Sequence, residues 1–509
     1  MNVEEKLTEI NRRRERLLQW GSHEEVEKQH RKGKLTARER VERLLDKGSF
    51  SEAELWTTPN ATGYDIDERT VLGDGVIAGY GRINGRSVCL WAQDYTVLGG
   101  SVGIIHAQKI ARLMEKALNA RIPCIGIIDS EGLRIEDFLS APTIYAYDRL
   151  TYLQTISSGV IPQISLVMGP CKGMAAISAM LSDFVYMVRD TSSMHISSSH
   201  ESDPDEKFGD AHMHASDSGC CDVIADSDKE CLEKCRALID FLPQNNAQRP
   251  GVIDTYDDPN RKEEDLLELV PVEQSKMYSM YKLISLIVDK GYFFEIKRYW
   301  AANLITGFAR LGGQSAGIIA NNPQNRGGCM DMNAADKMAR FVRFCDAFNI
   351  PLIWLSDTPA FLPAIKEERG GIIRHGAKVV SANSLATVPQ ITVYIRKCYG
   401  GGNLAMPGEC LGGDMTFAWP TAVVSPMIPE GAVAILYRKE IEAAENPEEL
   451  RKDRAKEFES ASGGILWKYI PVQEFIDPRE TRPTLIKALS TLSDKNEDVI
   501  WRKHDNIPL

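Results

Sequence analysis

Two glycine-containing turns are the residues best placed for chemistry in this sequence. Gly173 follows the apolar run 161–168, and Gly400, Gly401 and Gly402 follow the apolar run 388–395. A strand that turns into a helix exposes backbone N–H groups, which can bind an oxyanion such as a thioester enolate, a ureido oxygen or a carboxylate. Glycine there permits positive φ and close approach of a ligand. A turn that only packs helix on strand is the alternative. The recurrence of the turn in both halves strengthens the functional interpretation but leaves this alternative open.

The two turns belong to an internal repeat that covers about 100 residues. The two copies keep one constant offset, which changes once, by a single position, where the second copy has lost a residue. The paired segments are 79–85 with 307–313, 99–100 with 327–328, 122–129 with 350–357, and 160–165 with 387–392. A register held over this length predicts a duplicated fold.

Each copy contains the elements of an α/β sheet. Asn84-Gly85 is typical of a type I′ turn, so residues 77–94 are expected to form a hairpin. Residues 103–118 carry apolar side chains on one helical face, and an apolar run then ends at Asp129. Such runs, alternating with helices, are typical of parallel strands that are covered on both faces.

The remaining segments suggest where the domains begin and end. Residues 1–48 are expected to be helical, with a capping box from Thr36 to Glu39, residues 195–220 to form a loop or lid, and residues 440–460 to form one charged helix. We expect an N-terminal helical segment 1–48, a first domain 49–250, a linker 251–275 and a second domain 276–509.

The composition is that of a multidomain globular protein. Hydrophobic residues make up 43% and charged residues 26% of 509 residues, with a net charge of −11, which disfavours nucleic-acid binding. The sequence contains no apolar run of the roughly 18 residues that a membrane helix needs. The start has no signal-peptide pattern, and eleven scattered cysteines suggest reduced thiols, so we expect a cytoplasmic protein.

Longer segments add a family resemblance. They are residues 33–40, 92–101 and 158–164 and, in the second half, 339–351, 370–378 and 418–422. Over about residues 25–440 the chain resembles the carboxyltransferase subunit of biotin-dependent acyl-CoA carboxylases and decarboxylases, of the propionyl-CoA carboxylase beta or methylmalonyl-CoA decarboxylase alpha type. The resemblance implies two tandem crotonase-like (ClpP/crotonase) α/β domains related by internal duplication.

The resemblance also implies a site for two substrates. The first domain of one subunit would hold the acyl-CoA, and the second domain of a neighbour would hold carboxybiotin. The catalytic groups would be the backbone of Gly173, Met174 and Ala175 for the thioester enolate, and of Gly400, Gly401 and Gly402 for the biotin ureido oxygen. The implied substrate-binding residues are Lys34, Arg38, Gly99, Gly100, Glu131, Gly132, Leu133 and Leu404, and the implied biotin-binding residues are Phe361, Leu362, Gly370, Gly371 and Ile372. For Lys34 and Arg38, a basic and solvated helix start is the alternative.

Some residues depart from the family pattern. Glu131 and Met174 stand where glycine is usual, and Leu404 stands where aspartate is frequent. Met174 keeps its N–H group, whereas a carboxylate at Glu131 is unfavourable beside an anion unless it is paired or protonated. We therefore expect an unusual acyl group or a weakened first site.

The implied cofactor is biotin on a separate carrier. The sequence has no Walker loop and no Met-Lys-Met biotinylation signature. The implied partners are a biotin carboxyl carrier protein, a biotin carboxylase or membrane decarboxylase subunits, and further copies of the chain in a hexamer built as a trimer of dimers. No metal is expected, because His200, Asp210, His212 and His214 lack standard ligand spacing.

Three alternatives stay open at this point. The same transfer could run in reverse, in a sodium-pumping decarboxylase. The chain could instead be a catalytically weakened assembly subunit. It could also be a biotin-independent crotonase-type hydrolase or isomerase that acts on CoA esters.

Overall fold

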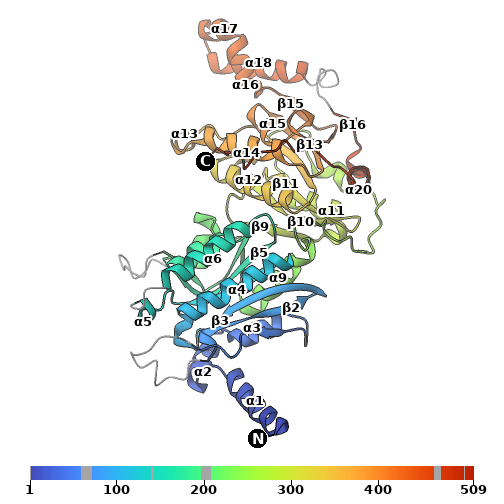
Figure 1. Cartoon of the computed structure of the whole chain (residues 1–509). Helices are drawn as coiled ribbons and strands as arrows, with labels where there is room; N and C mark the ends of the chain where they lie inside the picture. Colours follow the sequence, from blue (N-terminus) through green and yellow to red (C-terminus); the bar gives the residue numbers. More distant parts are fainter. Residues whose placement is uncertain are drawn as a thin grey trace. The chain divides into compact units, whose positions relative to one another are not determined.

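The structure is a computed structural model that describes residues 2–58, 72–138, 143–196, 208–462, 472–497 and 499–508. The chain forms two compact units, Met1–Arg249 and Pro250–Leu509 (Figure 1). Residues 251–275, which the sequence suggests as a linker, fall within the second unit.

The first unit is built on a mostly parallel sheet with the strand order β1-β2-β3-β4-β5-β6-β8, and β7 also pairs with β5. Its strands are β1 (Ser51–Ala53), β2 (Val76–Ile83), β3 (Arg86–Gln93), β4 (Cys124–Ser130), β5 (Gln163–Lys172), β6 (Phe184–Val188), β7 (Ser193–His195) and β8 (Val223–Ala225). The expected hairpin is present: β2 and β3 are antiparallel, and Asn84 and Gly85 between them have φ angles of 51° and 78°.

Helices cover this sheet and extend the unit at its N-terminus. The helices are α1 (Val3–Leu18), α2 (His23–Arg31), α3 (Ala37–Leu44), α4 (Ile104–Ala120), α5 (Ile135–Phe138), α6 (Thr143–Ser157), α7 (Met174–Met180), α8 (Ala211–Met213) and α9 (Asp228–Phe241). The long helices α4 and α6 pack side by side (Figure 1). Thr36 and Glu39 form the predicted capping box at the start of α3.

The second unit repeats this architecture with the strand order β16-β14-β13-β12-β11-β10-β9, and β15 also pairs with β13. Its strands are β9 (Phe293–Ile296), β10 (Leu304–Leu311), β11 (Gln314–Asn321), β12 (Leu352–Thr358), β13 (Gln390–Tyr399), β14 (Met415–Ala418), β15 (Val423–Ser425) and β16 (Glu474–Phe475). Its helices are α10 (Leu266–Leu269), α11 (Met280–Ile287), α12 (Met332–Ala347), α13 (Ile365–Gly370), α14 (Ile372–Leu385), α15 (Gly401–Ala405), α16 (Pro429–Leu436), α17 (Arg438–Ala443), α18 (Pro447–Ser462) and α20 (Thr481–Thr491). Helices α12 and α14 pack together as α4 and α6 do.

The strand boundaries confirm the predicted duplication. The strands β2, β3, β4 and β5 recur as β10, β11, β12 and β13, and each begins and ends at the position that the sequence repeat predicts. Both copies also share an irregularity: the register shifts between Ile128 and Ser130 where β4 meets β5, and between Ser356 and Thr358 where β12 meets β13. A shared defect at equivalent positions indicates one fold used twice.

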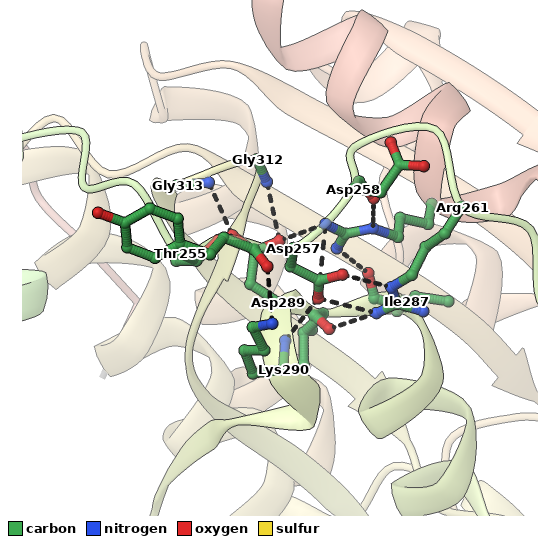
Figure 2. A network of polar contacts seen from close by, with 12 residues as sticks. Thr255, Asp257, Asp258, Arg261, Ile287, Asp289, Lys290, Gly312 and Gly313 are labelled. Carbon is green, nitrogen blue, oxygen red and sulfur yellow. Dashed lines mark hydrogen bonds and ion pairs between the residues drawn. The ribbon is translucent and has the colours of Figure 1, made fainter.

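A buried polar network fixes the beginning and the end of the second unit to its hairpin (Figure 2). The Asp289 carboxylate accepts hydrogen bonds from the Gly312 and Gly313 amides at 2.9 and 2.7 Å, and from the Thr255 hydroxyl at 2.8 Å. Arg482, fully buried on α20, forms an ion pair with Asp289 at 2.7 Å. Asp289 thus accepts hydrogen bonds both from Thr255, a predicted linker residue, and from the turn of the hairpin. The shared carboxylate holds Thr255 beside the sheet.

Two further segments differ from or add to the sequence expectations. The charged stretch 440–460 is not one helix: α17 ends at Ala443 and α18 begins at Pro447, because proline has no backbone N–H with which to continue a helix. Part of the expected loop 195–220 lies outside the described residues, and the remainder contains α8 and a π-helical turn, His214–Ser218. Within the described ranges, no helix has the length and apolar character needed to cross a membrane.

Candidate active site

The two glycine turns have the same backbone conformation. Gly173, after β5, has φ 63° and ψ −128°, and Gly400, after β13, has φ 51° and ψ −126°. An L-residue with a side chain rarely adopts these angles, so glycine is required for the path of the chain. In both copies the glycine N–H is already used, donating at 2.9 Å to the His195 carbonyl in the first turn and to the Ser425 carbonyl in the second.

The N–H groups that follow each glycine are available for a ligand. Met174 and Ala175 begin α7, and Gly401 and Gly402 begin α15. The first N–H groups of a helix have no acceptor within the helix. Over the described residues, none of these four groups donates to another protein atom. Each turn therefore presents a pair of adjacent donors, as an oxyanion site requires.

The first turn lies at a pocket of about 360 Å³. The pocket brings together five of the expected site residues, namely Glu131, Gly132, Leu133, Gly173 and Met174. It is completed by Ile135, Tyr147, Asp148, Lys172 and Ile196. The described part of the lining is mainly apolar, and its charged residues are Glu131, Asp148 and Lys172, which is typical of a small-molecule site.

Glu131 is ionised and paired within this pocket. The Lys172 ammonium forms an ion pair with the Glu131 carboxylate, and the Tyr95 hydroxyl donates to its second oxygen at 2.8 Å. Burial raises the pKa of Glu131, but the hydrogen bonds from Lys172 and Tyr95 outweigh it, so the pKa is lowered overall. Burial and the bond to Glu131 raise the pKa of Tyr95, which therefore stays a donor. The carboxylate that departs from the family pattern is thus neutralised.

Lys34 does not line this pocket. Its side chain is 5% exposed, and its Nζ donates at 2.8 Å to the Asp129 carboxylate at the end of β4. Arg40, which is fully buried, binds the other oxygen of Asp129 at 2.8 Å. Burial lowers the pKa of Lys34, and Asp129 opposes that shift. The Lys34 ammonium is thus hydrogen-bonded to Asp129. Its contact with CoA remains a prediction.

Three other expected residues of the first unit, Arg38, Gly99 and Gly100, are not among the described residues that line the pocket. Arg38 pairs with Glu52 at 3.0 Å and lies over the Trp20 ring. A Cβ on Gly99 would be 3.2 Å from Glu131, and a Cβ on Gly100 would be 2.1 Å from the Asp129 carbonyl. Gly100 is therefore needed for close packing against β4, whereas Gly99 adjoins the lining residue Glu131.

The second turn is bordered by Phe361. A Cβ on Gly401 would be 2.9 Å from the Phe361 ring, and one on Gly402 would be 2.7 Å from the Thr358 side chain. The Leu362 N–H donates to the Met330 carbonyl at 2.7 Å, and Leu404 on α15 is 47% exposed. Gly370, Gly371 and Ile372 form the junction of α13 and α14, where Gly371 has φ 91° and Ile372 is buried. The structure thus places Phe361 with the second turn and the three junction residues on the helices beside it.

Sequence reasoning did not identify Lys172, Tyr95 or Tyr147 as parts of the first site. Lys172 directly precedes the glycine turn, so its position carried a signal. Tyr95 lies in one of the segments that resemble the family, but nothing in the sequence indicates that its hydroxyl reaches Glu131. Tyr147 comes from α6, and only the tertiary fold brings this helix to the pocket.

The described residues contain no group of three or more His, Cys, Asp or Glu side chains that could hold a metal ion. His214 makes short contacts instead, with the Met194 carbonyl at 2.6 Å and the Ser218 hydroxyl at 2.8 Å. His200 lies outside the described residues.

Comparisons with known proteins show the family to which the chain belongs. The carboxyl transferase domain family matches residues 28–507. The methylmalonyl-CoA decarboxylase subunit alpha of Veillonella parvula is 42% identical over 514 residues, covering 100% of this chain and 99% of the relative. The propionyl-CoA carboxylase beta chain of Roseobacter denitrificans is 41% identical, covering 99% of each.

A solved structure extends the similarity to three dimensions. The transcarboxylase 12S crystal structure, a hexamer assembly with methylmalonyl-coenzyme A and methylmalonic acid bound, matches with a TM-score of 0.94 and 38% identity, covering 100% of this chain and 99% of that one. The fold is therefore crotonase-like in both units, as expected. This chain belongs to the carboxyl transferase domain family, as a carboxyltransferase of the propionyl-CoA carboxylase and methylmalonyl-CoA decarboxylase type.

Proposed function

We propose that this chain moves a carboxyl group between biotin and the α-carbon of an acyl-CoA thioester. The observation that carries the proposal is the pair of matched turns, each with a glycine in the same rare conformation and two backbone donors behind it. Family membership supplies the type of reaction, and the duplicated donors supply one anion site for each substrate.

In the first unit, the pocket beside Gly173 takes the acyl group. The Met174 and Ala175 N–H groups stabilise the negative charge that develops on the thioester oxygen when the α-carbon becomes nucleophilic. The apolar side chains of Leu133, Ile135 and Ile196 line the pocket and give the acyl chain an apolar surface to contact. No side-chain acid or base is needed for this role.

In the second unit, the residues around Gly400 fit biotin. The N–H groups of Gly401 and Gly402 match the ureido oxygen, which only accepts hydrogen bonds, and the Phe361 ring offers an apolar wall directly beside Gly401. When bound, biotin supplies the nitrogen that carries the carboxyl group. Phe361, Leu362, Gly370, Gly371 and Ile372 would position it.

The assembly completes this proposal. We expect biotin to arrive on a separate carrier protein, with a biotin carboxylase or membrane decarboxylase subunits as the further partners. A hexamer is expected because the transcarboxylase structure of nearly full-length similarity is a hexamer assembly. A cytoplasmic location is supported by the eleven cysteines, all of which lie in described segments and are free thiols.

The test is carboxyl exchange with the purified full-length chain. Free biotin and either methylmalonyl-CoA or malonyl-CoA are supplied, and formation of propionyl-CoA or acetyl-CoA is followed by chromatography. Turnover that depends on biotin supports the proposal. When biotin is supplied on its carrier protein instead, avidin should abolish the turnover. Hydrolysis that proceeds equally without biotin would indicate a crotonase-type hydrolase. The absence of turnover on any thioester would leave the chain as an assembly subunit.

A further inference from the structure

The ion pair between Glu131 and Lys172 is not required by the fold. The second unit has Pro359 and Tyr399 at the equivalent positions of the repeat. There β12 and β13 end with the same register shift, and Gly400 adopts the same conformation as Gly173. Because the fold forms without these charges, their presence in the first unit needs another reason.

Stability is a weak reason for keeping the pair. The side chains of Lys172 and Glu131 are 26% and 39% exposed. Ion pairs of this exposure contribute little to the free energy of unfolding, because solvent screens them. An ion pair in the lining of a mainly apolar pocket instead points to a ligand that carries charge.

The hydrogen bonds leave Lys172 as the unsaturated partner. Each Glu131 oxygen already has a donor, one from Lys172 and one from Tyr95. Among the described residues, Glu131 is the one hydrogen-bond and ion-pair partner of the Lys172 ammonium, and an ammonium has three donors. Lys172 therefore keeps donors for an acceptor group in the pocket, while Tyr95 and Glu131 hold its position.

The charges of the pocket lining indicate which acceptor group on a ligand would bind Lys172. Glu131 and Asp148 are acidic, and Lys172 is the one basic side chain among the described residues of the lining. A thioester that carries the transferred carboxylate would be repelled by the two acids unless a cation contacts it. Lys172 also directly precedes Gly173, so it adjoins the turn that holds the thioester oxygen.

We propose that Lys172 binds the carboxylate of the carboxylated thioester and so sets the preference of the first pocket for the carboxylated over the uncarboxylated acyl-CoA. Glu131 competes for the same ammonium and moderates this preference. The inference rests on the proposed function, since it assigns the pocket to an acyl-CoA.

The experiment measures the equilibrium binding of two thioesters that differ by one carboxylate, methylmalonyl-CoA and propionyl-CoA. Calorimetry is carried out on the full-length chain without biotin, so the result does not depend on turnover. Lys172→Met should weaken methylmalonyl-CoA about 10-fold, in line with a charged hydrogen bond, and should leave propionyl-CoA unchanged. Glu131→Gln should act in the opposite direction and tighten methylmalonyl-CoA, because it frees the ammonium.

The matched control is Lys234→Met. Lys234 pairs with Glu230 on α9 at 2.8 Å, with exposures of 35% and 37%, and it is not among the residues of the pocket lining. This variant makes the same change of charge and should alter neither affinity. Lys172→Arg keeps the charge and should retain most of the preference.

Two results would overturn the inference. If Lys172→Met changes both thioesters equally, the lysine only shapes the pocket wall. If Glu131→Gln weakens methylmalonyl-CoA as Lys172→Met does, the intact pair and not the free ammonium is what matters. Failure of the exchange assay together with the predicted binding pattern would instead reject the proposed function and keep this assignment.

Discussion

At the scale of single residues, alanine at position 173 is permitted by the space around Gly173 but opposed by its backbone conformation. Among the described residues, a Cβ there would have only the Ile196 carbonyl within 4 Å, at 3.8 Å, so alanine fits sterically against them. The backbone angles are the obstacle, at a cost of order 1–3 kcal/mol. Gly173→Ala should therefore relax the turn and turn the Met174 and Ala175 N–H groups away. We expect kcat for biotin exchange to fall by roughly 10²–10³-fold, the usual loss for an oxyanion donor.

A glycine outside the site separates the loss of donors from general strain. Gly48 has φ 74°, and a Cβ added to it would have no atom of the described segments within 4 Å. Gly48→Ala should lower the urea midpoint of unfolding while kcat stays at the level of the unchanged protein. A Gly173→Ala variant that keeps full kcat would contradict the role given to the first turn.

At the scale of elements, the two units neutralise an equivalent aspartate in different ways. In the second unit Asp357, at the end of β12, is paired with Arg396 from the neighbouring strand β13 at 3.1 Å. In the first unit the equivalent of Arg396 is Gly169, and a Cβ there would lie 2.6 Å from the Lys34 Nζ. In the first unit the cation beside the aspartate is therefore Lys34, which comes from the N-terminal segment outside the sheet. In the second unit it is Arg396, which belongs to a strand of the sheet.

This exchange explains what the sequence could and could not predict. The strands, the hairpin at Asn84-Gly85 and both turns followed from local patterns that recur at a fixed offset. The partner of Lys34 did not, because it depends on the missing side chain at Gly169 and on Asp129, residues far apart in the chain. The pairing of Glu131 likewise could not be predicted from the sequence, because only the folded sheet brings Tyr95 and Lys172 into contact with it.

Arg40 tests the docking of the N-terminal segment. It contacts Asp129 and Asp228 at 2.8 Å each, and all three side chains are buried. Arg40→Met should lower the free energy of unfolding by about 3–5 kcal/mol, because it leaves two buried carboxylates short of a cation. Urea unfolding combined with hydrogen exchange in β4 and β5 measures the effect. Arg149→Met, which breaks a half-exposed pair with Glu115, should cost no more than about 1 kcal/mol, and equal effects of the two changes would refute this account.

At the scale of the whole molecule, the proposal needs the first turn of one copy to work with the second turn of another. Two impaired variants can test this, Gly173→Ala in the first turn and Gly400→Ala in the second, where a Cβ would also lie 3.0 Å from the Pro426 carbonyl. Each variant alone should show a kcat that is lower by roughly 10²–10³-fold. When the two are co-expressed with different tags, a mixed pair contains one site built from two intact turns. If the copies pair at random, about one quarter of the sites should have two intact turns, so about one quarter of the exchange activity should return. The activity is measured on complexes purified through both tags and is corrected for the enrichment of mixed pairs. If every site used both turns of the same copy, no mixture could restore activity, so a result at the level of the single variants would show that the reaction is completed within one chain.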